Sequence, residues 1–577
     1  MKRLAQGWNG AAAAELETPL SDTRRRARWG HLLLAGVLGV AHTQAFAPRD
    51  WWWLQLLALA GLAALLFDTR RARDAAALGY AFGLGWFLSG IWWLYISMHV
   101  YGEMPAWMAA LAVLLFAGYL ALYPALAAAA WHRAAAPRRF DPARRAGWFG
   151  LLAAPLAFGA AWGLAEWLRG VIFTGFPWLG SGYAHTDGPL AGYAPLLGVY
   201  GIGALAALCA AWLAALARVA RPGSGGSAGA AGAAESPGSP QGERAGALSA
   251  TLPATPWARL AVPLGLAVLL GAGWLLAGRA WTEPVGAPLS VRLLQGNVPQ
   301  DIKFEAAGIA RSNALYRDMI TAAPADLVVT PETAFPLILQ DMPPEIALAL
   351  RQFSTGTGTA LLFGAAGADS PIDFTNSVFG IGPEMQGLYR YDKHHLVPFG
   401  EFIPWGFRWF VDMMKMPLGD FRRGGLAQAP LPVRGVMVAP NICYEDLFGE
   451  EIARTLRGQR EPANVLVNVT NLAWFGDTIA LDQHLQISRM RALETRRPML
   501  RSTNTGMTAV VAPDGSVPAR LATFTTGTLS AQVQGTRGLT PYVRVGNVPA
   551  VLGCLLMLLA VAWHAPSGRG RGRSGGA

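Results

Sequence analysis

Long apolar runs alternate with short polar connections over the first half of this 577-residue chain, and one more apolar run lies near its C-terminal end. Each run reaches or approaches the roughly 20 residues that a helix needs to cross a hydrocarbon core. The first two runs are short enough that a hairpin dipping into the bilayer is an alternative to two crossings. The pattern predicts a membrane domain of about eight transmembrane helices, near residues 31–47, 51–67, 76–98, 107–131, 147–168, 196–217, 258–278 and 547–564.

A polar region at residues 285–545 separates the last two apolar runs, and within it short β-rich runs alternate with helix-length segments. Such alternation is typical of an α/β domain, in which functional side chains usually follow the ends of strands. The predicted strands lie at 289–294, 327–330, 360–364, 436–439, 465–469 and 508–511, and the predicted helices include 306–322, 344–352 and 481–491.

The composition also favours a membrane protein, because 53% of the residues are hydrophobic and 14% are charged. The net charge of +11 comes largely from arginines in alternate connections, so it indicates topology and no nucleic-acid partner. Positive residues favour the cytoplasmic side, which predicts a cytoplasmic N-terminus and a periplasmic or extracellular polar region. The expected order is a cytoplasmic segment 1–30, six transmembrane helices within 31–221, a disordered cytoplasmic linker 222–256, a seventh helix within 257–280, the polar domain 285–545, an eighth helix at 547–564 and a cytoplasmic tail 565–577.

Only one of the three cysteines, Cys443, lies in the polar region, because Cys209 and Cys554 fall in apolar runs. No disulfide can therefore form within that region. A lone thiol on the oxidising side of a membrane suggests a functional reason for keeping it. Cys443 follows the apolar run 436–439 in the segment Pro-Asn-Ile-Cys-Tyr-Glu-Asp, which makes it a candidate nucleophile.

Two further segments supply what a cysteine nucleophile needs. An unperturbed thiol is only a few per cent ionised at neutral pH, so it requires a base or a nearby cation. Glu332, in Thr-Pro-Glu-Thr, could accept the thiol proton, and Lys393, in Tyr-Asp-Lys-His-His, could stabilise a thiolate and then an oxyanion. The backbone N–H of Tyr444 is a candidate second oxyanion donor. Taken singly, each residue also fits an ordinary structural role: a buried hydrophobe, a helix cap or a solvated lysine.

The sequence contains none of the common metal- or cofactor-binding motifs that we considered. No Gly-rich phosphate loop, Cys-x-x-Cys pair or His-Glu-x-x-His motif occurs, so neither a metal nor a cofactor is expected. His394, His395 and His484 lack ligand spacing and are assigned structural or hydrogen-bonding roles.

The three segments resemble the Glu-Lys-Cys triad of the nitrilase superfamily, and other motifs narrow the resemblance to the apolipoprotein N-acyltransferase family. It covers nearly the whole chain apart from the linker and the two ends. The motifs that carry it are Gln-Gly-Asn-Val-Pro-Gln at 295–300, Glu-Trp-Leu-Arg-Gly at 166–170, Thr-Gly-Phe-Pro-Trp at 174–178, Ala-Trp-Phe-Gly at 473–476 and Thr-Pro-Tyr at 540–542.

The resemblance implies an α-β-β-α sandwich facing the periplasm from a bacterial inner membrane. The implied reaction moves an acyl chain from a phospholipid, through a thioester on Cys443, to the α-amino group of a diacylglyceryl-cysteine on an apolipoprotein. Glu332 would then be the base and Lys393 the oxyanion stabiliser. The residues that match supporting positions of the family are Glu401, Tyr444 and Glu445.

Two positions depart from the family pattern. Phe304 stands where the family commonly has Trp, which keeps an aromatic surface, whereas Leu472 stands where it commonly has Asp, which leaves any role of that carboxylate open.

The acyl substrate would need an apolar entrance. Aromatic and methionine side chains at helical spacing predict either ordinary core or an interfacial lid that dips into the membrane. They are Trp405, Phe407, Trp409, Phe410, Met413, Met414 and Met416, and Phe304 and Trp474 are further candidates for lipid contact. Arg169 could meet a lipid headgroup or pair with Glu166.

Two other functions remain open from the residues. One is a membrane-anchored amidase or nitrilase that uses the same triad with water as acceptor. The other is a transporter or scaffold whose polar domain only binds a ligand, which ionisable residues inside the spans would favour.

Overall fold

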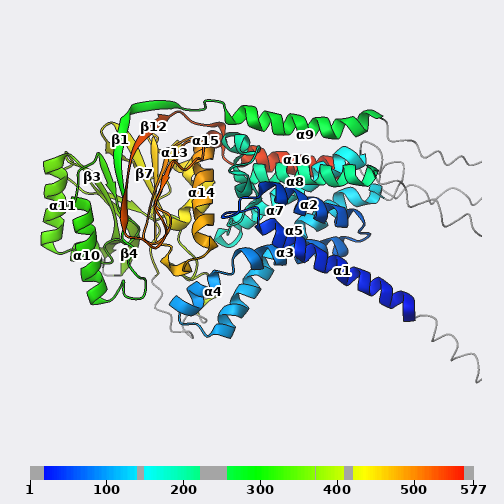
Figure 1. Cartoon of the computed structure of the whole chain (residues 1–577), viewed down its shortest axis with the longest axis horizontal. Coiled ribbons are helices and arrows are strands. Elements are labelled where there is room, and N and C mark those ends of the chain that lie inside the picture. Colours follow the sequence, from blue (N-terminus) through cyan, green and yellow to red (C-terminus); the bar gives the residue numbers. More distant parts are fainter. Residues whose placement is uncertain (1–17, 140–148, 221–255, 371, 409–419, 564–577) are drawn as a thin grey trace, which may run out of the picture.

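A computed structural model describes residues 18–139, 149–220, 256–370, 372–408 and 420–563. It consists of a helical bundle with an α/β sandwich at one end (Figure 1). Part of the predicted lid, including Trp409 and the three methionines, lies outside the described residues.

Each predicted apolar run forms helix. The bundle contains α1 (Thr18–Thr43), α2 (Trp52–Phe67), α3 (Ala72–Gly90), α4 (Leu94–Ile96), α5 (Ala106–Arg139), α7 (Ala154–Val171), α8 (Ala194–Ala220), α9 (Pro256–Ala277) and α16 (Val548–Trp563), with a π-helical turn η1 (Ser97–Tyr101) after α4 and another, η2 (Phe149–Ala153), before α7. The single helix predicted over 76–98 is wrong. Helix α3 ends at Gly90, and the segment Leu94–Tyr101 continues at an angle of 60°.

Among the described residues, four helical segments are long and apolar enough to cross a membrane, or five if the bent pair is one span. The four are Ala106–Ala135, Phe149–Thr174, Ala191–Arg218 and Leu260–Ala277. Helices α2 and α16 are apolar but shorter. The membrane character of the bundle follows from these helices, whereas the number of crossings stays a prediction.

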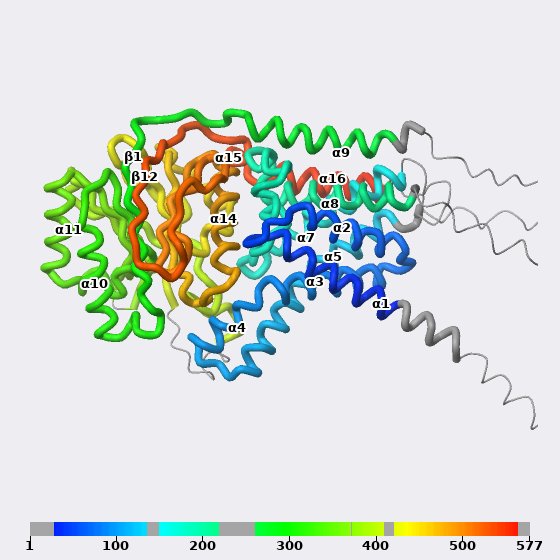
Figure 2. Tube along the Cα trace, viewed as in Figure 1, coloured from blue at the N-terminus to red at the C-terminus, as the bar shows by residue number. Residues whose placement is uncertain are grey.

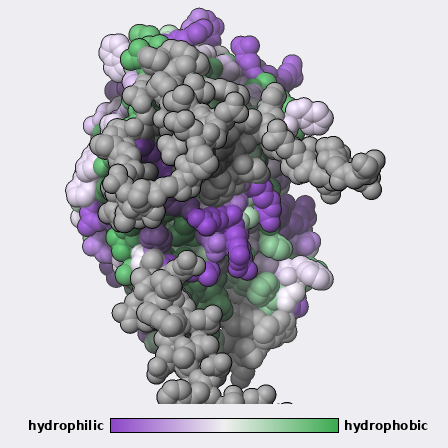
Figure 3. Space-filling model, turned by 90° about the vertical axis from the view of Figure 1, so that its right-hand side faces the viewer, coloured by the Kyte–Doolittle hydropathy of each residue, from purple (hydrophilic) through white to green (hydrophobic). Residues whose placement is uncertain are grey.

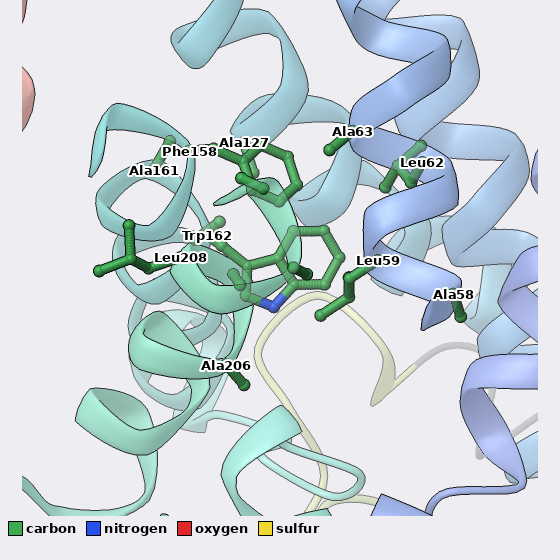
Figure 4. Packing of buried hydrophobic residues seen from close by; sticks show 14 of the residues in the cluster. Ala58, Leu59, Leu62, Ala63, Ala127, Phe158, Ala161, Trp162, Ala206 and Leu208 are labelled. Atoms are coloured by element: carbon green, nitrogen blue, oxygen red, sulfur yellow. The ribbon is translucent and has the colours of Figure 1, made fainter. Parts of the chain in front are cut away.

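Small residues let the bundle helices approach closely around large aromatic side chains. Trp162 of α7 lies at the centre of one such layer, with Leu59 of α2, Phe158 of α7 and Leu208 of α8 around it (Figure 4). Seen from the end away from the sandwich, hydrophilic side chains gather near the middle of the molecule (Figure 3). The connection between α2 and α3 lies at this end and carries the exposed Arg70, Arg71 and Arg73.

The α/β domain is built from two sheets of six strands each. The first has the order β12-β1-β2-β3-β4-β5 and the second β11-β10-β9-β8-β7-β6. Parallel pairs at the centre, β2 with β1 and β3, and β8 with β7 and β9, are flanked by antiparallel ones. The strands are β1 (Glu283–Gln295), β2 (Leu327–Val329), β3 (Ala360–Ser370), β4 (Asp373–Ile381), β5 (Tyr389–Asp392), β6 (Leu431–Val433), β7 (Val436–Ile442), β8 (Val465–Thr470), β9 (Met499–Thr503), β10 (Ala509–Val511), β11 (Ala519–Arg520) and β12 (Gly527–Arg537).

The two sheets pack face to face through apolar side chains, and helices pack on their outer faces. Val291 and Leu293 of the first sheet share one buried cluster with Val438 and Val467 of the second. The outer faces are covered by α10 (Ala306–Thr321) and α11 (Pro344–Thr357) on one side and by α13 (Gly449–Gly458) and α14 (Ile479–Thr495) on the other. The layers therefore follow the expected α-β-β-α order.

Helix α14 contacts the bundle and lies beside it in both views of the backbone (Figure 2). Its Ile487 and Met490 belong to the same buried cluster as the bundle helices. Polar contacts reinforce the junction, because Glu494 Oε1 accepts a hydrogen bond of 2.8 Å from the backbone N–H of Val199 in α8. The adjacent turn η7 (Cys443–Leu447) consequently lies on the bundle side of the sandwich.

Candidate active site

Cys443 occupies the sharp turn between β7 and η7. Its backbone has a φ of 51°, a left-handed conformation that non-glycine residues seldom adopt and that costs about 1–3 kcal/mol. The turn is held by Asn468, whose Nδ2 donates to the carbonyl of Cys443 at 3.2 Å. The residue as a whole is partly exposed, as a nucleophile must be to meet a substrate.

Glu332 and Lys393 come from the first sheet, just beyond the ends of β2 and β5. Lys393 Nζ lies 2.8 Å from Glu401 Oε1 and 3.5 Å from Glu332 Oε1. Asn376 of β4 lies between the two carboxylates, and its Nδ2 donates to both at 2.7 Å. The second oxygen of Glu332 accepts from the backbone N–H of Asn471 at 2.9 Å. Both carboxylates are thus fixed by several donors each.

The charges of Glu332 and Lys393 change the pKa of the Cys443 thiol. Burial and, after it, the charge of Glu332 raise the pKa of the Cys443 thiol to about 12, although Lys393 opposes them. Burial alone would lower the pKa of Lys393, but Glu401, Glu332 and Cys443 raise it above its ordinary value. The resting site therefore holds a charged ammonium, which is the state that can stabilise a developing oxyanion.

Glu445 ties the loop of Lys393 to the turn of Cys443. Its carboxylate accepts hydrogen bonds from the backbone N–H of Ile442 at 2.6 Å, the N–H of His394 at 2.7 Å and the hydroxyl of Tyr391 at 3.0 Å. Burial raises the pKa of Glu445, and the net pKa is about 7 although the backbone donors oppose the rise. The neighbouring Tyr444 is anchored differently, since its hydroxyl donates to the carbonyl of Gly175 in the bundle at 3.0 Å.

The structure brings together Glu332, Lys393, Glu401 and the turn of Cys443, and it leaves the candidate lipid contacts exposed. Phe304 and Trp405 are 55% and 98% exposed. Trp474 is 38% exposed and its ring meets Tyr101 edge-on at 5.9 Å.

The three histidines make hydrogen-bond contacts. His394 Nδ1 lies 2.8 Å from the carbonyl of Gly424, His395 Nδ1 lies 2.9 Å from Glu451, and His484 Nδ1 lies 2.8 Å from Arg501. Within the described part of the chain, no group of His, Cys, Asp and Glu side chains could hold a metal ion.

Arg169 and Leu472, whose roles the sequence left open, are both buried. Arg169 is 1% exposed and lies 3.5 Å from Glu166, so it pairs with that carboxylate. Leu472 is fully buried, with a methyl group near Gly506.

Sequence reasoning missed Asn376, Asn471 and Lys303. Lys303 is buried, and its Nζ donates to Thr333 Oγ1 at 3.0 Å, directly beside Glu332. Its place in the Gln-Gly-Asn-Val-Pro-Gln-Asp-Ile-Lys segment was a usable signal. Asn376 offered none, because it lies in the middle of a strand and not after its end.

Two family models match this chain, one over each of its two domains. A family model described as carbon-nitrogen hydrolase matches residues 290–542, the region of the sandwich. A second, described as apolipoprotein N-acyltransferase N-terminal domain, matches residues 38–212 of the bundle. A solved amidase of the nitrilase superfamily from Nesterenkonia AN1 is matched with a TM-score of 0.34 at 18% identity, over 46% of this chain and 97% of that one.

Relatives extend the match to almost the full chain. An apolipoprotein N-acyltransferase of Ralstonia nicotianae is 62% identical over 91% of this chain and 92% of its own length. Another from Chromobacterium violaceum is 42% identical over 92% of this chain and 94% of its own. The chain belongs to the apolipoprotein N-acyltransferase family.

Proposed function

We propose that this protein moves an acyl chain from a phospholipid to the α-amino group of a diacylglyceryl-cysteine at the start of an apolipoprotein. The observation that carries the proposal is the position of Cys443: a strained, partly exposed cysteine beside a Glu–Lys–Glu cluster, on the side of the sandwich that meets an apolar helical bundle. A soluble acyl donor would not require that bundle, whereas a lipid donor does.

The first half-reaction forms a thioester. Glu332 accepts the thiol proton while Sγ of Cys443 attacks the ester carbonyl of the phospholipid. The ammonium of Lys393 and the backbone N–H of Tyr444 stabilise the resulting oxyanion. When the tetrahedral intermediate collapses, the ester C–O bond breaks, and Glu332 returns the proton to the departing lysophospholipid oxygen. A thiol with a pKa of about 12 requires this coupled transfer, because little free thiolate exists at neutral pH.

The second half-reaction transfers the chain. The neutral α-amino group of the lipoprotein cysteine attacks the thioester carbonyl, and Glu332 accepts a proton from the nitrogen. The C–S bond then breaks, and the thiolate of Cys443 recovers the proton. The products are an amide-linked third acyl chain and the free thiol.

Glu401 and Glu445 support the catalytic groups without reacting. Glu401 holds Lys393 through a direct contact of 2.8 Å and accepts from the backbone N–H of Val397 at 2.8 Å. Glu445 fixes the distance between the Lys393 loop and the Cys443 turn through its bonds to both.

The apolar approach to the site accounts for transfer to an amine in preference to water. Phe304, Trp405 and Trp474 are exposed aromatic side chains of the α/β domain, and we assign them to contact with lipid. The segment 405–416, with Trp409, is proposed as the interfacial lid. A thioester that faces lipid hydrolyses slowly because bulk water has little access to it.

The proposed topology keeps the eight crossings of the sequence prediction. It places residues 1–30, 222–256 and 565–577 in the cytoplasm and residues 285–545 in the periplasm, with the helices in the inner membrane. Labelling of cells by a membrane-impermeant thiol reagent tests this orientation. With Cys443→Ala in both chains to remove the native periplasmic thiol, the cysteine of Glu283→Cys should react in intact cells, and that of Ser224→Cys only after the membrane is broken.

The direct test supplies the purified protein with phospholipid and a synthetic diacylglyceryl-cysteine peptide. The expected product is the peptide carrying one more acyl chain in amide linkage, together with lysophospholipid. Free fatty acid with an unchanged peptide would instead indicate a hydrolase. No turnover of lipid at all would favour a binding protein.

A further inference from the structure

Arg169 is a charged residue buried near the end of α7 that faces the sandwich. Its NH2 lies 3.5 Å from Glu166 Oε1, and its guanidinium lies 5.6 Å and 5.2 Å from the ring centroids of Trp86 and Phe87. With 1% of its surface exposed, it has no room for a lipid headgroup. A charge in such a place is costly unless other groups compensate it.

Arg169 contacts the loop that follows α7, which we call the clamp loop (residues 173–178). Arg169 NH1 donates to the backbone carbonyl of Phe176 at 2.6 Å and to that of Trp178 at 2.8 Å. The carbonyl of Arg169 in turn accepts from the N–H of Phe176 at 2.9 Å. One residue thus binds the loop from both its side chain and its backbone.

The backbone of the clamp loop is strained. Phe173, Thr174 and Gly175 are consecutive and have φ values of 53°, 71° and 86°. A side chain at Gly175 would come within 2.0 Å of the carbonyl oxygen of Gly170. The left-handed conformation is unfavourable for residues other than glycine, so the loop keeps this shape only if its surroundings impose it. The hydrogen bonds of Arg169 are among the contacts that do so.

The clamp loop touches the α/β domain at two points near the nucleophile. The carbonyl of Gly175 accepts the hydroxyl of Tyr444, the residue next to Cys443, at 3.0 Å. The indole Nε1 of Trp178 donates to Gln483 Oε1 of α14 at 2.7 Å, and Trp93 Nε1 reaches the same oxygen at 3.3 Å. Through this loop the bundle therefore contacts the turn η7, which contains Cys443 and Tyr444.

We propose that Arg169, oriented by Glu166, is a positioning residue for acyl transfer. It fixes the clamp loop, the loop fixes the side chain of Tyr444, and Tyr444 fixes its own N–H beside the reacting carbonyl. This inference rests on the proposed function, in which that N–H stabilises the oxyanion. It also gives the membrane domain a part in the chemistry beyond holding lipid.

A double-mutant cycle tests the route of this influence. The variants are Arg169→Lys, Tyr444→Phe and the two combined, and the readout is the rate of acyl-enzyme formation by intact mass in a single turnover. Lysine keeps the charge but cannot donate to both carbonyls from one planar group, so each single variant should form the acyl-enzyme about 10- to 100-fold more slowly. The combined variant should be within about threefold of the slower single one, because both changes cut the same path.

Arg491→Lys is the matched control. Arg491 is also fully buried and lies 3.1 Å from a glutamate three residues away, Glu494, but it makes no bond to the clamp loop among the described contacts. Its effect should multiply with that of Tyr444→Phe. If Arg169→Lys does not fold in detergent, Glu166→Gln enters the same cycle in its place.

Two results would overturn the inference: a rate for Arg169→Lys within threefold of the native rate, or effects of Arg169→Lys and Tyr444→Phe that multiply as the control does. A native protein that forms no acyl-enzyme would instead overturn the proposed function, so the two failures are distinguishable.

Discussion

Asn376 offers the sharpest test of how Glu332, the proposed base, is held. Its Nδ2 donates to Glu332 Oε1 and to Glu401 Oε1, both at 2.7 Å, and so bridges two carboxylates that would otherwise repel each other. The substitution Asn376→Ala removes both bonds and leaves the Lys393 ammonium, 3.5 Å from Glu332 and 2.8 Å from Glu401, as a donor between the two carboxylates in the described site.

The magnitude follows from the bonds that remain. A hydrogen bond to a charged group contributes about 1.5–3 kcal/mol, but Glu332 keeps its bond of 2.9 Å from the N–H of Asn471. We therefore expect a loss of about 2–3 kcal/mol in transition-state stabilisation, equal to a rate of acyl-enzyme formation about 30- to 150-fold lower.

The assay is the single-turnover rate of acyl-enzyme formation, followed by intact mass, with thermal unfolding measured in parallel. The matched control is Asn547→Ala, because Asn547 is also buried and donates to a carboxylate, Glu450, at 3.3 Å, but away from the site. A rate for Asn376→Ala within threefold of the native rate would refute the reasoning. So would an equal slowing in the control.

Two further predictions follow from buried groups around Glu332. Burial lowers the pKa of Lys303 from 10.5 to about 8, and Glu332 opposes the shift. Below pH 8 Lys303 is charged in both the folded and the unfolded chain, so burying its ammonium destabilises the fold fully. Between pH 8 and 10.5 the lysine is neutral in the folded protein but still charged in the unfolded chain, so the destabilisation decreases as the pH rises. Lys303→Met should therefore raise the melting temperature more at pH 7 than at pH 10, and a difference independent of pH would contradict this. A methyl group at Gly364 would lie 2.6 Å from backbone atoms of both Pro331 and Thr333, so Gly364→Ala should displace Glu332. The variant should lose about 1–3 kcal/mol of stability and form the acyl-enzyme at least about tenfold more slowly. The control Gly387→Ala has nothing within 4 Å and should leave rate and melting temperature nearly unchanged, and equal behaviour of the two variants would disprove the clash.

The central strands were predictable because parallel strands buried on both faces appear as continuous apolar runs. The strands β2, β7 and β8 are fully or almost fully buried and coincide with predicted runs. The edge strand β12 was missed, because six of its eleven residues are at least partly exposed before its first buried one and its sequence is polar and contains glycine. Hydropathy detects burial, and an edge strand is only half buried.

The bend after Gly90 was equally invisible to hydropathy, which records how apolar a segment is and not its direction. The carbonyl of Gly90 leaves the helical pattern and accepts the indole N–H of Trp93 at 3.0 Å. A side chain at Gly90 would meet Leu179 at 2.2 Å, so the bend depends on packing between distant segments.

For the site, the sequence could indicate Glu332, Lys393 and Cys443 because each follows a strand end, and strand ends converge. It could not indicate Asn376, whose role depends on the face it presents within β4. Nor could it decide what Arg169 contacts, since the pairing with Glu166 and the clamp loop arises only from the packed bundle.

The most direct test of the central claim is the intact mass of the detergent-solubilised protein after incubation with phospholipid, compared with Cys443→Ala and Cys443→Ser. The account predicts an increase of one acyl chain that hydroxylamine removes from the native protein and that is absent from Cys443→Ala. The absence of any adduct on the native protein, with lipid accessible, would contradict covalent acyl transfer through Cys443.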